Sequence, residues 1–139
     1  MLDNSVFESA FYTAIAEYFK EDRKVTVIHG EIDKERDFPV IGIVPGTSER
    51  ADFTKELWQH TLPLYVDIYI RSDESDLYTS AIAYQKIIQQ VISDELLEEM
   101  PGVFSVDLNS INSQDFNSEG VEYSSRTRLE WQIEYHTER

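Results

Sequence analysis

Residues 57–71 read LWQHTLPLYVDIYIR, and this stretch decides the fold. Apolar side chains alternate along it with polar or half-polar ones, which is the period of a β-strand that buries one face. At about 3.3 Å per residue such a strand reaches roughly 50 Å, whereas a compact domain of this size is about 35–40 Å across. We therefore expect a long β-hairpin arm that projects from the body, is bent or bulged at Pro63, and carries the polar loop 47–56.

Two amphipathic helices are predicted, one before and one after that strand. Apolar residues recur at helical spacing over 7–19, where Tyr18 shares the apolar stripe, and again over 77–92. The hydroxyl and carboxylate groups of Ser72, Asp73 and Glu74 are expected to start the second helix. Ser93 and Asp94 resemble a second cap. We expect the second helix to break there and a short turn to follow over 95–99, because acids at the end of one continuous helix would oppose its dipole.

Shorter apolar or alternating runs predict the remaining strands. These runs cover 25–28, 38–44, 103–108 and 121–135, and the polar segment 109–120 is predicted to be a loop. Strands in consecutive groups between two helices are typical of an α+β fold. We expect two helices packed on a mainly antiparallel, mixed β-sheet in a single domain, residues 1–139.

The composition excludes several classes of function. The chain of 139 residues carries 27 Asp and Glu against 12 Lys and Arg, a net charge of −15. A surplus of acids this large argues against general nucleic-acid binding and against binding to an anionic membrane. The absence of Cys excludes disulfides and thiolate sites, so a reducing cytoplasm suits the chain. No signal peptide and no apolar run of about 20 residues is found.

No motif for catalysis or cofactor binding is found. His29, His60 and His136 fall on separate predicted strands or strand ends, which leaves a convergent metal site open but favours ordinary sheet positions. Carboxylates are too numerous for an acid–base pair to be chosen from them. We expect no catalytic, cofactor-binding or metal-binding residues, and no enzyme activity.

The charges are unevenly distributed along the chain. Arg36, Arg50 and Lys55 lie near the polar loop, which also carries Phe53 and is followed by Trp58. Between Ile87 and Ser125 there are acids and no Lys or Arg: Asp94, Glu95, Glu98, Glu99, Asp107, Asp115, Glu119 and Glu122. This pattern is typical of a solvated surface, but it also suits copies that pair head to tail and close into a ring.

The series of segments resembles a known family. DFPVIGI at 37–43, the Trp-containing strand LWQHTLPLYVDIY at 57–69, the acid-rich helix start at 73–77 and the closing strand that ends IEY at 133–135 are similar to the lambda-type phage tail terminators. The similarity covers about 37–135. No single segment is diagnostic; the ordered series at matching spacing makes the resemblance.

The resemblance implies a structural virion protein. It implies a hexameric ring that caps the growing tail tube, ends its polymerisation and provides the surface on which the head docks. The arm can supply the contact with the neighbouring copy, through Arg36, Arg50, Phe53, Lys55 and Trp58. DNA would pass through an acidic bore without specific binding, and the residues predicted for it are Asp94, Glu95, Glu98, Glu99, Asp115 and Glu119.

The partners that the resemblance implies are copies of the chain itself, the tail tube protein and a head-side connector or neck protein. The location it implies is the virion tail, assembled in the bacterial host cytoplasm. Two alternatives stay open: an acidic DNA mimic that inhibits a DNA-binding protein, and a small hydrolase, for which no nucleophile is recognisable.

Overall fold

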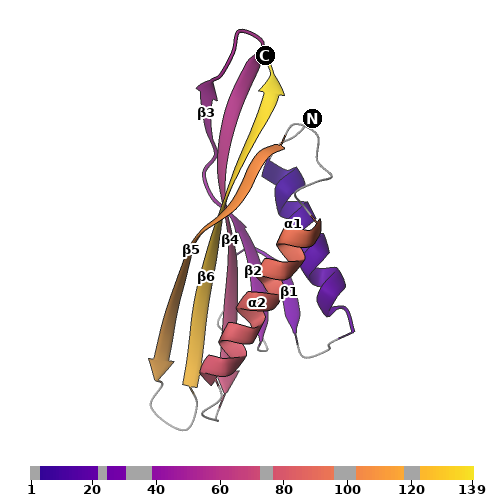
Figure 1. Ribbon diagram of the computed structural model, residues 1–139. Helices are drawn as coiled ribbons and strands as arrows, with labels where there is room; N and C mark the ends of the chain where they lie inside the picture. Colours follow the sequence, from indigo (N-terminus) through magenta and orange to yellow (C-terminus); the bar gives the residue numbers. More distant parts are fainter. Residues whose placement is uncertain (1–3, 22–24, 31–38, 73–76, 96–102, 118–122) are drawn as a thin grey trace.

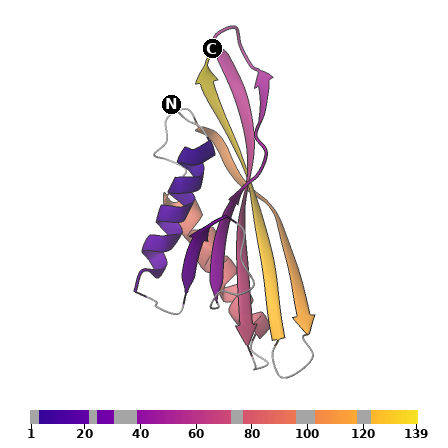
Figure 2. The ribbon, with the colours of Figure 1, turned by 180° about the vertical axis from the view of Figure 1, so that it is seen from behind.

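The computed structural model describes residues 4–21, 25–30, 39–72, 77–95, 103–117 and 123–139. Both helices lie on one side of a twisted sheet (Figure 1), and the view from behind shows the same arrangement (Figure 2). The predicted α+β fold is therefore confirmed. In chain order the elements are α1 (Asn4–Phe19), β1 (Thr26–His29), β2 (Val40–Pro45), β3 (Glu49–Asp52), β4 (Leu57–Ser72), α2 (Leu77–Glu95), β5 (Val103–Asn117) and β6 (Tyr123–Glu138).

The sheet is mixed but mainly antiparallel, as predicted. Its strand order is β1-β2-β4-β6-β5, and β3 pairs with β4 outside this path. Only the β1–β2 pair among the described strands is parallel. The face that carries α1 and α2 is called the inner face below, and the opposite face is called the outer face.

β4 is the central strand and passes through Pro63 without a bulge. It pairs with β6 along its whole length with no shift in register. On its other side it pairs with β3 up to Thr61 and with β2 from Leu64 onward. The Pro63 carbonyl points into the gap between β3 and β2, where the Gly46 amide donates to it at 2.7 Å. In a β-strand the N–H and the C=O of one residue point to the same side, so the N–H that proline lacks would also point into this gap. No hydrogen bond of the ladder between β4 and β6 is therefore lost at Pro63. The predicted bulge is wrong.

A projecting arm extends beyond the helices, as predicted (Figure 1, Figure 2). We define the arm as residues 49–61 and 134–139. β3 pairs there with the first half of β4, and β4 pairs on its other side with the end of β6. Residues 47–56 were predicted to be a loop, and this prediction is wrong for β3. All of the β3 residues are exposed, so the strand has no apolar alternation that would reveal it.

The core lies between the inner face and the two helices. α1 packs on β6 through aromatic pairs, Phe7 on Tyr135 at 4.9 Å and Phe11 on Trp131 at 5.5 Å between ring centroids. Tyr18 was predicted on the buried stripe of α1 but is 57% exposed, so that prediction is wrong. The fully buried side chains of the core include Ile15, Ile41, Ile43, Leu62, Leu64, Ile68, Ile88, Ile92, Leu129 and Ile133.

α2 continues through Ser93 to Glu95, so the predicted break at Ser93 is wrong. Ile88 and Ile92 are buried and hold this end of the helix against the core. Burying one such side chain is worth about 1.5–3 kcal/mol, whereas an unfavourable charge at a helix end costs about 0.3–1 kcal/mol. A turn was predicted over 95–99, but Glu95 belongs to α2 and 96–99 lie outside the described residues. The helix start predicted at 72 is wrong, because Ser72 is the last residue of β4; residues 73–76 lie outside the described residues.

β5 extends far beyond its predicted end. A strand over 103–108 and a loop over 109–120 were predicted, but β5 continues to Asn117 and pairs with β6 throughout. The register shifts between Val103 and Ser105 and again between Leu108 and Ser110. The second half of β5 has a mostly polar sequence, and neither α1 nor α2 packs on it (Figure 1). Its strand conformation therefore depends on pairing with β6 and not on burial.

Candidate assembly site

The residues predicted for a subunit interface meet at the arm, with one exception. Arg50 lies in β3, Phe53 and Lys55 lie in the β3–β4 turn, and Trp58 lies at the start of β4. Arg50 and Lys55 are exposed, Phe53 is 51% exposed, and Trp58 is half-buried. Arg36 lies outside the described residues.

Trp58 is held between two arginines. The guanidinium carbons of Arg50 and Arg139 lie 4.1 Å and 3.8 Å from the centroid of its ring. The strand register explains the meeting, because Asp52 lies opposite Trp58 and forms an ion pair with Arg139. Cation–π contacts at exposed sites contribute about 0.5–1 kcal/mol each. Packing inside the arm therefore accounts for much of the Trp58 environment. Phe53 stacks on His136 with 4.3 Å between ring centroids, but its side chain is 51% exposed and is the more open of the two to a partner.

A histidine completes the inner face of the arm. The His60 ring stacks on Tyr135 with 4.6 Å between centroids, and His60 Nε2 lies 2.7 Å from the Thr137 hydroxyl. Burial lowers the pKa of His60, and the charges of Arg50 and His136 lower it further. The neutral imidazole is therefore the favoured form in the folded arm.

Charges of both signs lie on the arm. Glu49, Asp52 and Glu56 are exposed in the same segment as Arg50 and Lys55. The arm is therefore not uniformly basic, and it can offer ion pairs of either sense to a neighbour.

The predicted acidic residues are only partly placed. Asp94 and Glu95 belong to the last turn of α2, and Asp115 belongs to β5 rather than to a loop, although the side chains of all three lie outside what the structure describes. Glu98, Glu99 and Glu119 lie outside the described residues. The acidic bore stays a prediction.

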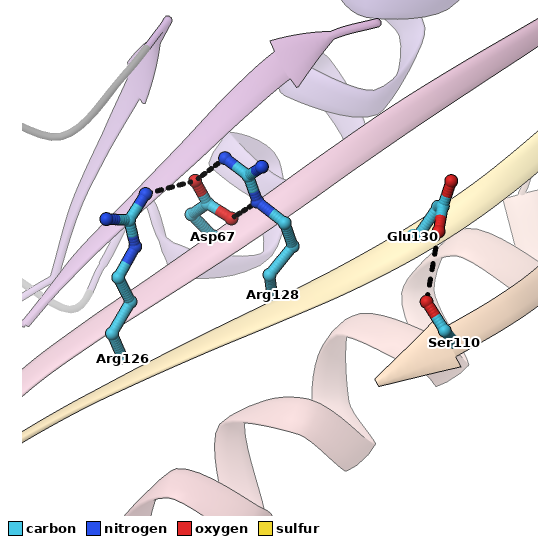
Figure 3. Close-up of polar contacts among 5 residues, drawn as sticks. All are labelled: Asp67, Ser110, Arg126, Arg128 and Glu130. Carbon is cyan, nitrogen blue, oxygen red and sulfur yellow. Dashed lines mark hydrogen bonds and ion pairs between the residues drawn. The ribbon is translucent and has the colours of Figure 1, made fainter. Parts of the chain in front are cut away.

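A charged cluster on the outer face was not predicted. Asp67 is fully buried, and both of its oxygens bind Arg128, from Nε at 2.7 Å and from Nη2 at 2.8 Å. Arg126 Nη2 reaches the same carboxylate at 3.3 Å (Figure 3). The signal available in the sequence was a lone acid inside the apolar run 64–70. Its partners could not be found because they lie in β6, far along the chain.

The same face carries acids nearer the arm. Glu130 accepts a hydrogen bond from the Ser110 hydroxyl at 3.0 Å (Figure 3), and Glu134 accepts one from Ser105 at 3.4 Å. In the part of the chain that the structure describes, neither of these acids forms an ion pair. Asp107 is exposed beside them on β5.

The described residues provide neither a cluster of metal ligands nor a membrane-spanning helix. Among the described residues, no group of three His, Cys, Asp or Glu side chains comes together as metal ligands would. None of the described helices is both long enough and apolar enough to cross a membrane.

Comparison with known proteins gives one informative likeness. No protein-family profile and no curated protein matches the chain. Among solved structures, the fold is similar to that of a chain in the virion of a native gene transfer agent particle, with a TM-score of 0.53. The match covers 94% of this chain and 94% of that one at 12% sequence identity. A likeness at this identity shows that the two chains share a fold.

Proposed function

We propose that this protein is a structural component of a phage or prophage virion and that it caps the tail tube as a homo-hexameric ring. The ring ends tube polymerisation and offers the surface on which the head docks. The observation that carries the proposal is the fold likeness to a chain of a gene transfer agent virion, because it spans 94% of both chains. The resemblance of residues 37–135 to tail terminators supports the more specific role at the tail end.

The arm supports self-assembly. A head-to-tail ring needs one surface that reaches out and a different surface that receives it. The arm extends beyond the helices and carries Phe53, an aromatic side chain that is half exposed. Exposed aromatic side chains on a rigid support are common anchors of protein interfaces. Trp58 and its two arginines stiffen the strands that hold Phe53 in place.

Such a protein works by assembly and catalyses no reaction. Its partners are other copies of itself, the tail tube protein and a head-side connector or neck protein, and its place is the virion tail after assembly in the host cytoplasm. DNA passes through the ring as cargo. A net charge of −15 suits this passage, because carboxylates repel phosphates and so prevent the DNA from binding.

The experiment is assembly on purified tail tubes. The full chain is mixed with tubes that lack a terminator, and the products are imaged by electron microscopy while the mass of the free protein is measured in solution. We expect six-fold rings at tube ends and tubes of fixed length. Tubes that continue to grow and carry no added density, together with a free protein that is monomeric at every concentration, would refute the proposal.

A matched pair of variants tests the arm as the contact. Phe53→Ala should reduce the fraction of capped tubes by about tenfold, because it removes an exposed anchor without opening the core. Tyr18→Ala is the control, since Tyr18 has a similar exposed fraction, 57% against 51%, but lies on α1. Equal capping by both variants and the wild type would exclude Phe53 from the interface.

A further inference from the structure

The outer face is divided into a cationic half and an acidic half. Along β6 its outward residues are Arg126 and Arg128, followed toward the arm by Glu130 and Glu134. The buried, inward residues of the same strand alternate with them. The change of sign therefore lies in the middle of β6, whose outward residues are half-buried. The close-up shows Arg126 and Arg128 reaching across to Asp67 of β4, on one side of Glu130 (Figure 3).

The cationic half holds an arginine with donors to spare. Two guanidinium groups bind the carboxylate of Asp67, and they do so unequally. Arg128 binds Asp67 through two nitrogens, whereas Arg126 reaches it through one nitrogen at 3.3 Å. The Arg126 side chain is 42% exposed. A guanidinium has five N–H donors, so Arg126 can bind a second carboxylate without leaving Asp67.

The acidic half is also held in position. Ser110 and Ser105 donate to Glu130 and Glu134, and Gln132 donates to Glu134 at 3.5 Å. These are neutral donors, so the negative charges are oriented but not neutralised by any cation of the described residues. Each half therefore offers an oriented charge to a group of the opposite sign.

We infer that the occupant of this face is the same face of a second copy. Two opposite charges side by side on one sheet face are complementary to themselves when a second copy is turned by a two-fold rotation. In the register that places Arg126 of each copy opposite Glu134 of the other, two equivalent ion pairs form at once. Sheets pack face to face about 10 Å apart, a gap that Arg and Glu side chains span together. A partner of one sign would leave half of the face unmatched.

This two-fold pairing goes beyond the proposed ring and is independent of it. A ring needs a head-to-tail contact between different surfaces, for which the arm is the proposed element. The outer-face pair joins two copies by identical surfaces. It predicts a dimer of the free protein even where no tail tube is present.

The test is sedimentation of the full chain over a wide range of protein concentration in about 0.15 M salt. At this salt concentration the Debye length is about 8 Å, so the long-range repulsion between acidic copies is screened, whereas ion pairs in direct contact are screened much less. The wild type should show a reversible monomer–dimer equilibrium. Arg126→Glu should weaken dimerisation by tenfold or more, because in a two-fold interface each substitution changes two symmetry-related contacts. Lys86→Glu is the matched control, since Lys86 is an exposed cation on α2 in the opposite layer and the change of charge is the same.

A charge swap distinguishes a specific contact from a general effect of charge. Glu134→Arg alone should weaken the dimer, and the double variant Arg126→Glu/Glu134→Arg should restore it to within about threefold of the wild type. Circular dichroism checks that each variant is folded. A wild type that stays monomeric, equal effects of Arg126→Glu and Lys86→Glu, or no restoration by the swap would overturn the inference. Capping of tail tubes by the same variants reports on the ring separately.

Discussion

Asp67 is the residue whose replacement should most disturb the sheet outside its apolar core. Asp67→Asn keeps the shape of the side chain but removes the negative charge that Arg126 and Arg128 both bind. We expect the free energy of unfolding to fall by about 1–3 kcal/mol, which is less than for a fully buried pair because the arginines are 42% and 34% exposed.

Urea unfolding of the purified protein measures this loss. Asp107→Asn is the control, because Asp107 is an exposed acid on the same face and its loss should change the free energy by less than about 0.5 kcal/mol. If both variants were equally stable, the Asp67 cluster would contribute nothing to folding.

His60 should make stability depend on pH. Its pKa in the folded arm is lowered below the ordinary value of 6.5, so as pH falls through 6.5 the unfolded chain takes up a proton before the folded chain does. The contribution of His60 to stability is therefore constant above about pH 6.5 and falls as pH decreases from there toward the folded pKa. His60→Gln should show a smaller loss of stability between pH 7.5 and pH 5.5.

Chemical unfolding at the two pH values checks this expectation. His29→Gln is the control, since His29 is exposed and stacks on Tyr12 at the other edge of the sheet. The same pH dependence in wild type and His60→Gln would show that other groups dominate in this range.

At the scale of elements, the junction between β2 and β3 depends on Gly46. A Cβ placed there would lie 2.8 Å from the Pro63 carbonyl oxygen, a backbone atom of the central strand. Gly46→Ala should therefore push β2 away from β4 and lower the free energy of unfolding by about 1–3 kcal/mol. Thr47→Ala, at the exposed neighbouring position, should have little effect in the same unfolding measurement. If Gly46→Ala were as stable as the wild type, the backbone between β2 and β3 would move away from Pro63 at little cost in free energy.

The elements that were predicted correctly are those whose burial leaves a period in the sequence. β4, β6 and α1 each bury one face, so apolar alternation or helical spacing reveals them. β3 and the second half of β5 have no such period, because they exist by pairing with a neighbour strand and their side chains are polar. The site divides in the same way. Arm residues that are close in sequence could be predicted to lie together, and their role as an interface stays a prediction. The contact of Arg139 with Trp58 and the partners of Asp67 depend on strand register.

At the scale of the whole molecule, the net charge of −15 sets the conditions for assembly. Copies of such a chain repel one another at long range, so a ring needs local contacts that oppose the repulsion. Arg50 and Lys55 are exposed cations of the arm, and in the proposed ring they would meet an acidic surface of a neighbour. Ring formation should therefore depend on salt in two opposite ways, because added salt screens both the repulsion between copies and the ion pairs at the contact.

Reversal of these two charges tests that contact. Arg50→Glu/Lys55→Glu should reduce the capping of tail tubes by about tenfold or more while the free chain stays folded, because the cations lie on the surface of the arm. Lys20→Glu/Lys86→Glu is the control, since it makes the same change of net charge at two exposed positions outside the arm, one just after α1 and one in α2. Lys55→Glu alone separates the interface from arm packing, because Arg50 also covers Trp58 whereas Lys55 forms no ion pair among the described residues. If the control double variant caps as poorly as the arm variant, net charge rather than the arm governs assembly. If Lys55→Glu reduces capping in a folded protein, the arm meets an acidic surface on the next copy.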